Sequence, residues 1–211
     1  MRRRRRGAVA TALVVALGAG LVGCGNDASS DPAAVSTATD GSVYDQADVD
    51  FLTGMIPHHA QAVQMVTMAQ GRQVSPKVRA LMDSIRDAQV PEVEQMSDWL
   101  EGWGKAVPAT SLDHAHGASG MDDMEGMEGM DGDQMAGMMS GDQMSELEQS
   151  SDADFERLWL QMMIEHHTGA VDSAETEIDD GKNPEVLELA QSIVTSQTAE
   201  IEQMKAMLGE Q

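Results

Sequence analysis

The sequence predicts an all-α protein, an antiparallel four-helix bundle made of two duplicated helical hairpins with a disordered methionine-rich insert between them. The duplication appears at a constant offset of 108 residues, where MIPHH at residues 55–59 returns as MIEHH at residues 163–167. At the same offset, EVEQM at residues 92–96 returns as EIEQM at residues 200–204. Aromatic residues make up only 3% of the chain, which has 18 methionines, so the core must be mainly aliphatic side chains and methionine. Such a core suits helices better than sheets.

The first 23 residues have the pattern of a secretory signal peptide. Five arginines at residues 2–6 precede an apolar run over residues 8–22, and this run closes in a tetrapeptide that resembles the lipobox of bacterial lipoproteins. The pattern predicts cleavage before Cys24 and lipidation of its thiol, which would anchor the protein to a membrane outside the cytoplasm. An uncleaved membrane anchor is the alternative, since the apolar run is near the lower length limit for a span. Residues 24–46 are predicted to be a flexible tether because they are rich in small and polar side chains.

The first predicted hairpin covers residues 47–104. Apolar side chains recur at spacings of three and four over residues 48–70, as on one face of an amphipathic helix, and Pro57 is expected to kink this helix or divide it. Ser75 and Pro76 provide an N-cap and a first-turn proline for a second helix.

The second predicted hairpin covers residues 151–211 and repeats this plan. Its first helix is expected over residues 154–179, and Asn183 followed by Pro184 caps its second helix. Each hairpin has one apolar face. The simplest way to bury both faces is to pack the hairpins against each other as a four-helix bundle.

Residues 105–150, between the hairpins, have an unusual composition. Eight methionines fall between residues 121 and 144, separated mainly by Gly, Asp, Glu, Gln and Ser, and the glycines oppose a helix. The segment is therefore predicted to be disordered until it binds a ligand. The alternative is a stripe of core methionines, which fits poorly with such polar neighbours. The methionines predicted to bind metal here are Met121, Met124, Met127, Met130, Met135, Met138 and Met139.

The chemistry of these donors indicates copper. Thioether sulfur is a soft ligand that favours Cu(I), and by the same logic Ag(I), over Mg²⁺, Ca²⁺ or Zn²⁺. With Cys24 lipidated, the mature chain has no thiol, so methionine must supply any soft metal ligand. His114 and His116 lie just before the tract and offer nitrogen donors that suit Cu(II), although a solvated pair of loop histidines is the alternative for them.

The two histidine pairs supply the remaining candidate ligands. In each copy a methionine lies one helical turn before two adjacent histidines, so a sulfur and one or two imidazoles share a helical surface suited to copper. The alternative is that the inner histidine of each pair is a buried, hydrogen-bonded core residue with a solvated neighbour. His59 and His167 are expected to face inward, and His58 and His166 to be the more accessible ligands. The candidate ligands are Met55, His58, His59, Met163, His166 and His167.

Several other function classes lack support in the sequence. A formal net charge of −23 argues against nucleic acid as a partner. The sequence has no Glu-x-x-His motif, so the usual di-iron site of helical bundles is absent, and it has no hydrolase or phosphate-loop pattern. The protein is therefore not expected to be an enzyme.

With these motifs, residues 47–208 resemble a bacterial family of unknown-function domains built on a duplicated ferritin-like hairpin, with M-I-x-H-H near the start of each half. The resemblance implies a ferritin-like bundle, an extracytoplasmic location and, from the studied members, binding of copper and silver in metal resistance. Pro57 in the first copy corresponds to Glu165 in the second, which is a departure from internal symmetry.

Together these observations predict an extracytoplasmic, lipid-anchored copper-binding protein. It would sequester Cu(I), or Ag(I), or exchange the ion with a donor or acceptor protein in metal homeostasis or resistance. Two alternatives are a ferritin-like redox metalloenzyme that uses the paired histidines, and a helical interaction module that binds no metal. The sequence leaves the oligomeric state open.

Overall fold

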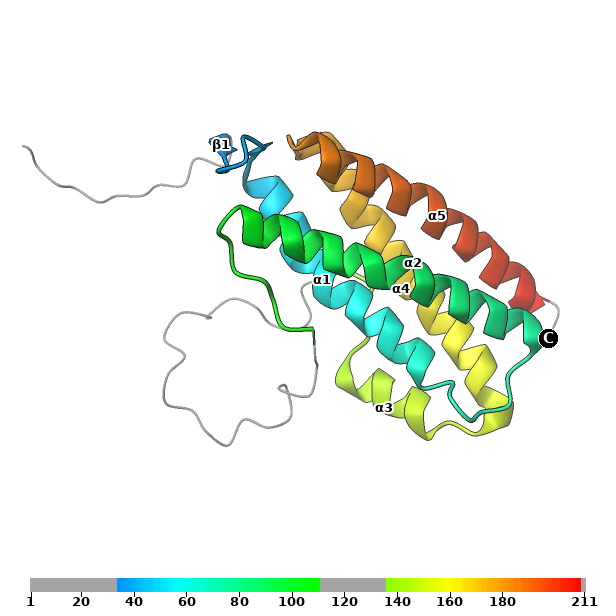
Figure 1. Cartoon of the computed structure of the whole chain (residues 1–211). Helices are drawn as coiled ribbons and strands as arrows, with labels where there is room; N and C mark the ends of the chain where they lie inside the picture. The colour runs from blue at the N-terminus through cyan, green and yellow to red at the C-terminus, as the bar shows by residue number, and fades with distance from the viewer. Residues whose placement is uncertain (1–33, 111–135, 210–211) are drawn as a thin grey trace, which may run out of the picture. The chain divides into compact units, whose positions relative to one another are not determined.

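A computed structural model of the protein describes residues 34–110 and 136–209 (Figure 1). Most of the described residues are helical, so the prediction of an all-α fold is confirmed. The described elements, in chain order, are β1 (Ser36–Thr37), β2 (Val43–Tyr44), α1 (Gln46–Thr67), α2 (Pro76–Gly102), α3 (Gly141–Gln149), α4 (Asp152–Asp180) and α5 (Pro184–Gly209).

Four long helices form the predicted bundle of two hairpins. Helix α1 packs on α2 and α4 packs on α5, with the two helices of each hairpin antiparallel (Figure 1). The hairpins meet through α1 and α4, where the indole Nε1 of Trp159 donates a hydrogen bond of 3.2 Å to the carbonyl oxygen of Met65. The four-helix arrangement of duplicated hairpins is therefore confirmed.

The second helix of each hairpin begins where the capping residues predict. Ser75 accepts a hydrogen bond from the backbone N–H of Val78, and Pro76 opens α2. In the second hairpin, the side-chain oxygen of Asn183 accepts from the N–H groups of Glu185 and Val186 at 2.9 and 3.1 Å. These side chains satisfy backbone donors that have no partner inside the helix.

The expectation that Pro57 would divide the first helix is wrong, because α1 is one element from Gln46 to Thr67. Proline removes one helical hydrogen bond and costs about 3 kcal/mol in a helix interior. Leu52, Met55 and Ile56, which precede it in the same helix, are fully buried apolar residues. Burial of large side chains, at about 1.5–3 kcal/mol each, therefore outweighs the local cost of the proline.

The expectation of disorder is wrong for the last part of the insert. Residues 136–150 are described, and they include α3, which starts at a capping box between Ser140 and Gln143. Met139, predicted as a metal ligand, is only 4% exposed and belongs to the apolar core with Met144. The alternative of core methionines therefore applies to these two residues, because their side chains reach the bundle despite their polar neighbours. Residues 111–135 lie outside the described ranges.

The predicted tether also contains structure at its C-terminal end. Strands β1 and β2 pair antiparallel, and the buried ring of Tyr44 stacks on that of Trp103 with centroids 4.3 Å apart. This stacking fastens the chain before α1 to the end of α2. Cys24 and the predicted signal peptide lie outside the described residues.

The buried apolar side chains form two clusters at opposite ends of the bundle. One joins the N-terminal halves of α1 and α5 to the C-terminal halves of α2 and α4. The other joins the remaining halves of these helices and includes Met139 and α3 residues. Polar side chains lie between the two clusters. Within the described ranges, no helix has both the length and the apolar character needed to cross a membrane.

Candidate metal centre

All four paired histidines lie in the polar layer between the two apolar clusters, and each is 0% exposed. Helix α1 carries His58 and His59, and α4 carries His166 and His167. The rings of His58 and His166 are in contact across the two helices, with centroids 3.7 Å apart. The duplication thus brings the two His-His motifs together in the centre of the bundle.

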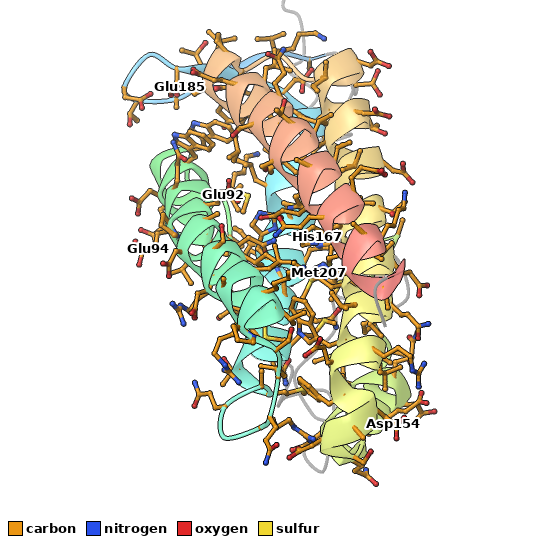
Figure 2. All side chains as sticks on the ribbon, turned by 90° about the vertical axis from the view of Figure 1, so that its right-hand side faces the viewer. Glu92, Glu94, Asp154, His167, Glu185 and Met207 are labelled. Carbon is orange, nitrogen blue, oxygen red and sulfur yellow. The ribbon has the colours of Figure 1, made fainter. Side chains whose placement is uncertain are left out.

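The other two histidines pair with glutamates from the second helix of each hairpin. His59 Nε2 lies 2.8 Å from Glu92 Oε2 on α2, and His167 Nε2 lies 2.8 Å from Glu200 Oε2 on α5. Figure 2 shows His167 inside the bundle and Glu92 on the inner side of α2, whereas Glu94 points outward. A carboxylate only accepts hydrogen bonds, so each Nε2 donates and Nδ1 keeps its lone pair in the neutral ring.

Six imidazole nitrogens have no hydrogen-bond partner among the described residues. They are both ring nitrogens of His58 and His166, and the Nδ1 atoms of His59 and His167. Leaving one buried polar atom unsatisfied costs about 1–3 kcal/mol. The alternative of a buried, hydrogen-bonded inner histidine fits His59 and His167, but the solvated neighbours that it expects do not fit the buried His58 and His166. Orphaned donors and acceptors of this kind are found at sites that bind a ligand.

Burial keeps these imidazoles neutral. Burial, together with smaller contributions from the neighbouring His59 and His167, lowers the pKa of His58 to about 3. Burial also moves the pKa of His166 well below its usual range, with a further contribution from His58. The pKa of His167 is lowered by burial as well, although Glu200 opposes the change. Neutral imidazole is the form that binds a metal ion.

Two glutamines complete the polar layer. Gln89 on α2 and Gln197 on α5 are 2% and 3% exposed, and the side-chain oxygen of each has no hydrogen-bond partner in the described part of the chain. The paired histidine motifs alone do not predict that these glutamines, or Glu92 and Glu200, belong to the site. A signal for them exists, since all four are polar residues that recur at the 108-residue offset on otherwise apolar faces.

The duplicated fold with its histidine layer is that of a known protein family. A family model described as "Domain of unknown function (DUF305)" matches residues 48–208. The chain belongs to the DUF305 family. The match spans both hairpins and the insert, so the resemblance based on the paired histidine motifs is confirmed. No curated protein matches the sequence.

Solved structures of the family have the same helical fold. A DUF305 fragment from Deinococcus radiodurans is 30% identical, with 83% of this chain and 100% of that chain covered and a TM-score of 0.64. CopM in its Cu(I)-bound form is 27% identical, with 77% of this chain and 96% of CopM covered and a TM-score of 0.58. CopM has also been solved with bound Cu(II) and with bound silver.

The structure corrects the expectation that His58 and His166 are the more accessible ligands. Adjacent helical residues point about 100° apart, so one histidine of α1 can face α4 while the other faces α2. Because a neighbouring helix lies in each direction, both side chains are buried. His59 and His167, expected to face inward, are equally buried.

The structure gives less support to the predicted methionine ligands than to the histidines. Met55 and Met163 are fully buried, but they belong to different apolar clusters on opposite sides of the histidine layer. Met138 is half-buried just before the buried Met139. The remaining predicted ligands lie outside the described residues: His114, His116, Met121, Met124, Met127, Met130 and Met135.

The donors of the histidine layer fit copper by type, since neutral imidazole is a common copper ligand. As the side chains stand, no group of three or more His, Cys, Asp or Glu residues in the described ranges is arranged to hold a metal ion. One reason is the direct contact of the His58 and His166 rings, which leaves no space between them. Binding an ion there requires these two rings to separate.

Proposed function

We propose that this protein is an extracytoplasmic lipoprotein that binds Cu(I), and also Ag(I), in order to sequester the ion or pass it to a partner protein. The observation that carries the proposal is the layer of four buried imidazoles with six unpartnered nitrogens. Their burial without partners destabilises the metal-free bundle, and coordination would satisfy them. Copper and silver binding by CopM, which has the same fold, supports the choice of ions.

Within this proposal, the histidines and glutamates have different roles. His58 and His166 would supply nitrogen ligands from the centre of the layer, where each has both ring nitrogens available. His59 and His167 would supply Nδ1, because their Nε2 atoms are held by Glu92 and Glu200. A carboxylate that accepts from the far nitrogen of a ligating histidine fixes the ring orientation and raises its basicity.

The methionine tract would be a second binding region with softer donors. Its thioethers favour Cu(I) and Ag(I), and they form no disulfides outside the cytoplasm. We leave Met139 out of this role because its side chain packs in the apolar core. We propose that the remaining tract methionines collect ions and that His114 and His116 contribute nitrogen donors to them.

We also propose that the protein is a carrier and has no catalytic activity of its own. The histidine layer is fully enclosed, so a substrate would have no contact with an ion held there. Oxygen consumption by the copper-loaded protein measures this directly. Sustained turnover above that of free copper would make it a redox enzyme instead.

The test of metal binding is a Cu(I) titration of the mature protein under reducing conditions in competition with a chromogenic chelator. We expect a stoichiometry above one, reduced separately by His58→Leu with His166→Leu and by replacing the tract methionines with leucine. Failure of the wild-type protein to compete with a weak chelator would overturn the proposal. Unchanged affinity in both variants would favour a helical module that binds no metal.

The location has its own test. We propose that Cys24 carries the lipid, so a Cys24→Ala variant should lose membrane association in cell fractionation while its bundle remains folded. Membrane retention of this variant would instead support an uncleaved anchor.

A further inference from the structure

The two hairpins differ at one pair of equivalent positions beside the histidine layer. Gln61 in α1 and Gly169 in α4 are 108 residues apart and each follows its histidine pair within a turn. Both residues contact the same short segment, residues 136–139, which we call the strap. The strap is the part of the insert that lies just before α3.

Gln61 holds the strap with two hydrogen bonds. The backbone N–H of Met139 donates to the side-chain oxygen of Gln61 at 2.7 Å, and Gln61 Nε2 donates to the carbonyl oxygen of Met139 at 2.8 Å. Gln61 is only 1% exposed, so both bonds are shielded from water. Such a paired contact fixes the position and direction of the backbone at Met139.

Gly169 makes room for the other end of the strap. A Cβ atom at this position would lie 1.8 Å from the carbonyl oxygen of Ala136 and 2.7 Å from the backbone nitrogen of Gly137. Gly137 itself has a φ of +82°, and a Cβ there would lie 2.6 and 2.9 Å from the carbonyl oxygens of Glu165 and His166. Only glycine allows backbone to approach backbone this closely.

These contacts place the strap across the junction of α1 and α4 where the rings of His58 and His166 meet. Its first half lies on the turn of α4 that carries His166, and its second half is fastened to α1 three residues after His58. Helices α2 and α5, which carry Glu92 and Glu200, provide the other partners of the layer. The strap thus covers a side of the histidine layer that α2 and α5 do not cover.

We infer that the strap closes the histidine layer, and that Gln61 and Gly169 are positioning residues that control how fast solutes reach His58 and His166. This inference rests on the proposed function only in naming the solute as a soft metal ion. In sequence, Met135 of the methionine tract directly precedes the strap, which itself contains Met138 and Met139. Opening of the strap would therefore connect the tract to the histidines.

The first measurement uses metal-free protein and does not depend on copper. Gln61→Ala removes both hydrogen bonds, and Gly169→Ala forces the strap away from α4. Each variant should increase the rate at which diethyl pyrocarbonate modifies His58 and His166 by about tenfold, the change expected for the loss of one or two hydrogen bonds. The controls are Gln64→Ala, which is exposed on the same helix, and Gly102→Ala, where a Cβ meets nothing.

The second measurement is the rate at which Ag(I) leaves each protein for an excess of chelator. Folded variants with unchanged histidine modification would overturn the inference. Faster modification without any silver bound at the histidines would support the strap and overturn the proposed function. If neither variant folds, the wild-type protein provides the test. The amide of Met139 should then exchange with solvent at the opening rate that limits histidine modification, and histidines that react only on global unfolding would overturn the inference.

Discussion

The rings of His58 and His166 lie in contact, 3.7 Å between centroids, although the two residues are 108 positions apart in the chain. They occupy equivalent positions in the two hairpins, so the centre of the internal duplication coincides with the centre of the candidate site. Neither ring makes a hydrogen bond of good geometry to a described residue, although the backbone of Ala136 beside His58 opposes the lowering of the His58 pKa. A contribution to the stability of the bundle therefore does not explain this contact.

Replacing His58 by leucine should separate stability from function. Leucine has no polar atom to satisfy, so the metal-free His58→Leu variant should be more stable than the wild type by about 1 kcal/mol. Its Cu(I) affinity should fall at least about tenfold because a ligand is lost. Urea unfolding of metal-free protein and chelator competition measure the two effects. A large loss of stability would instead show that His58 has a structural role.

Glu92 should influence metal affinity through His59. Glu92→Gln keeps the shape of the side chain but removes the charge that raises the basicity of the ring, so we expect about a tenfold loss of Cu(I) affinity. Glu94→Gln is the matched control, since Glu94 is exposed on the same helix (Figure 2). Chelator competition measures the Cu(I) affinity of both variants. Equal affinities would show that Glu92 has no part in orienting the ligand.

Met139 should behave as a core residue. Met139→Ala should lower the free energy of unfolding by about 2–4 kcal/mol, because a fully packed side chain leaves a cavity. Met138→Ala, at a half-buried position, should cost less than about 1 kcal/mol. Urea unfolding of the metal-free variants measures both changes. A small stability loss at Met139 combined with weaker Cu(I) binding would restore it as a ligand.

The bundle could be predicted because its four long helices each contain many turns of a regular apolar pattern, and because the pattern occurs twice. The short elements could not. Helix α3 has nine residues in a polar, glycine-containing context, and it depends on burying Met144 and Leu147 against the bundle. Strands β1 and β2 have two residues each, and the contact between Tyr44 and Trp103 that accompanies them spans 59 positions. Such tertiary contacts stabilise short elements that the local sequence alone does not favour.

The site was predictable only in part, for a similar reason. The spacing of His58 and His59 shows that they point in different directions, but it does not show that helices lie in both directions. Glu92 and Glu200 come from other helices, and each lies 33 residues after its histidine. This equal separation in both copies is a sequence signal for the pairing, although one helix pattern alone does not reveal it.

Glu177 is an ionisable group outside the metal centre that should affect stability. It is 2% exposed on α4, and its carboxyl oxygens have no hydrogen-bond donor among the described residues. Burial, together with smaller contributions from the hydrogen bonding and charge of the neighbouring Asp48, raises the pKa of Glu177 to about 9. Asp48 itself accepts hydrogen bonds from the backbone N–H groups of Lys182 and Asn183, at 3.1 and 2.8 Å.

The pH dependence follows from this raised pKa. Between the ordinary glutamate pKa of about 4.5 in the unfolded chain and about 9 in the folded protein, the folded protein binds a proton at Glu177 that the unfolded chain does not. The free energy of unfolding should therefore decrease as pH rises through this window. Glu177→Gln mimics the protonated acid and removes the decrease, so this variant should gain about 1–3 kcal/mol over the wild type by pH 8.5. Urea unfolding at pH 5.5 and 8.5 tests this, with the exposed Glu175→Gln on the same helix as control. A difference between wild type and Glu177→Gln that does not grow with pH would show that Glu177 is ionised in the folded protein.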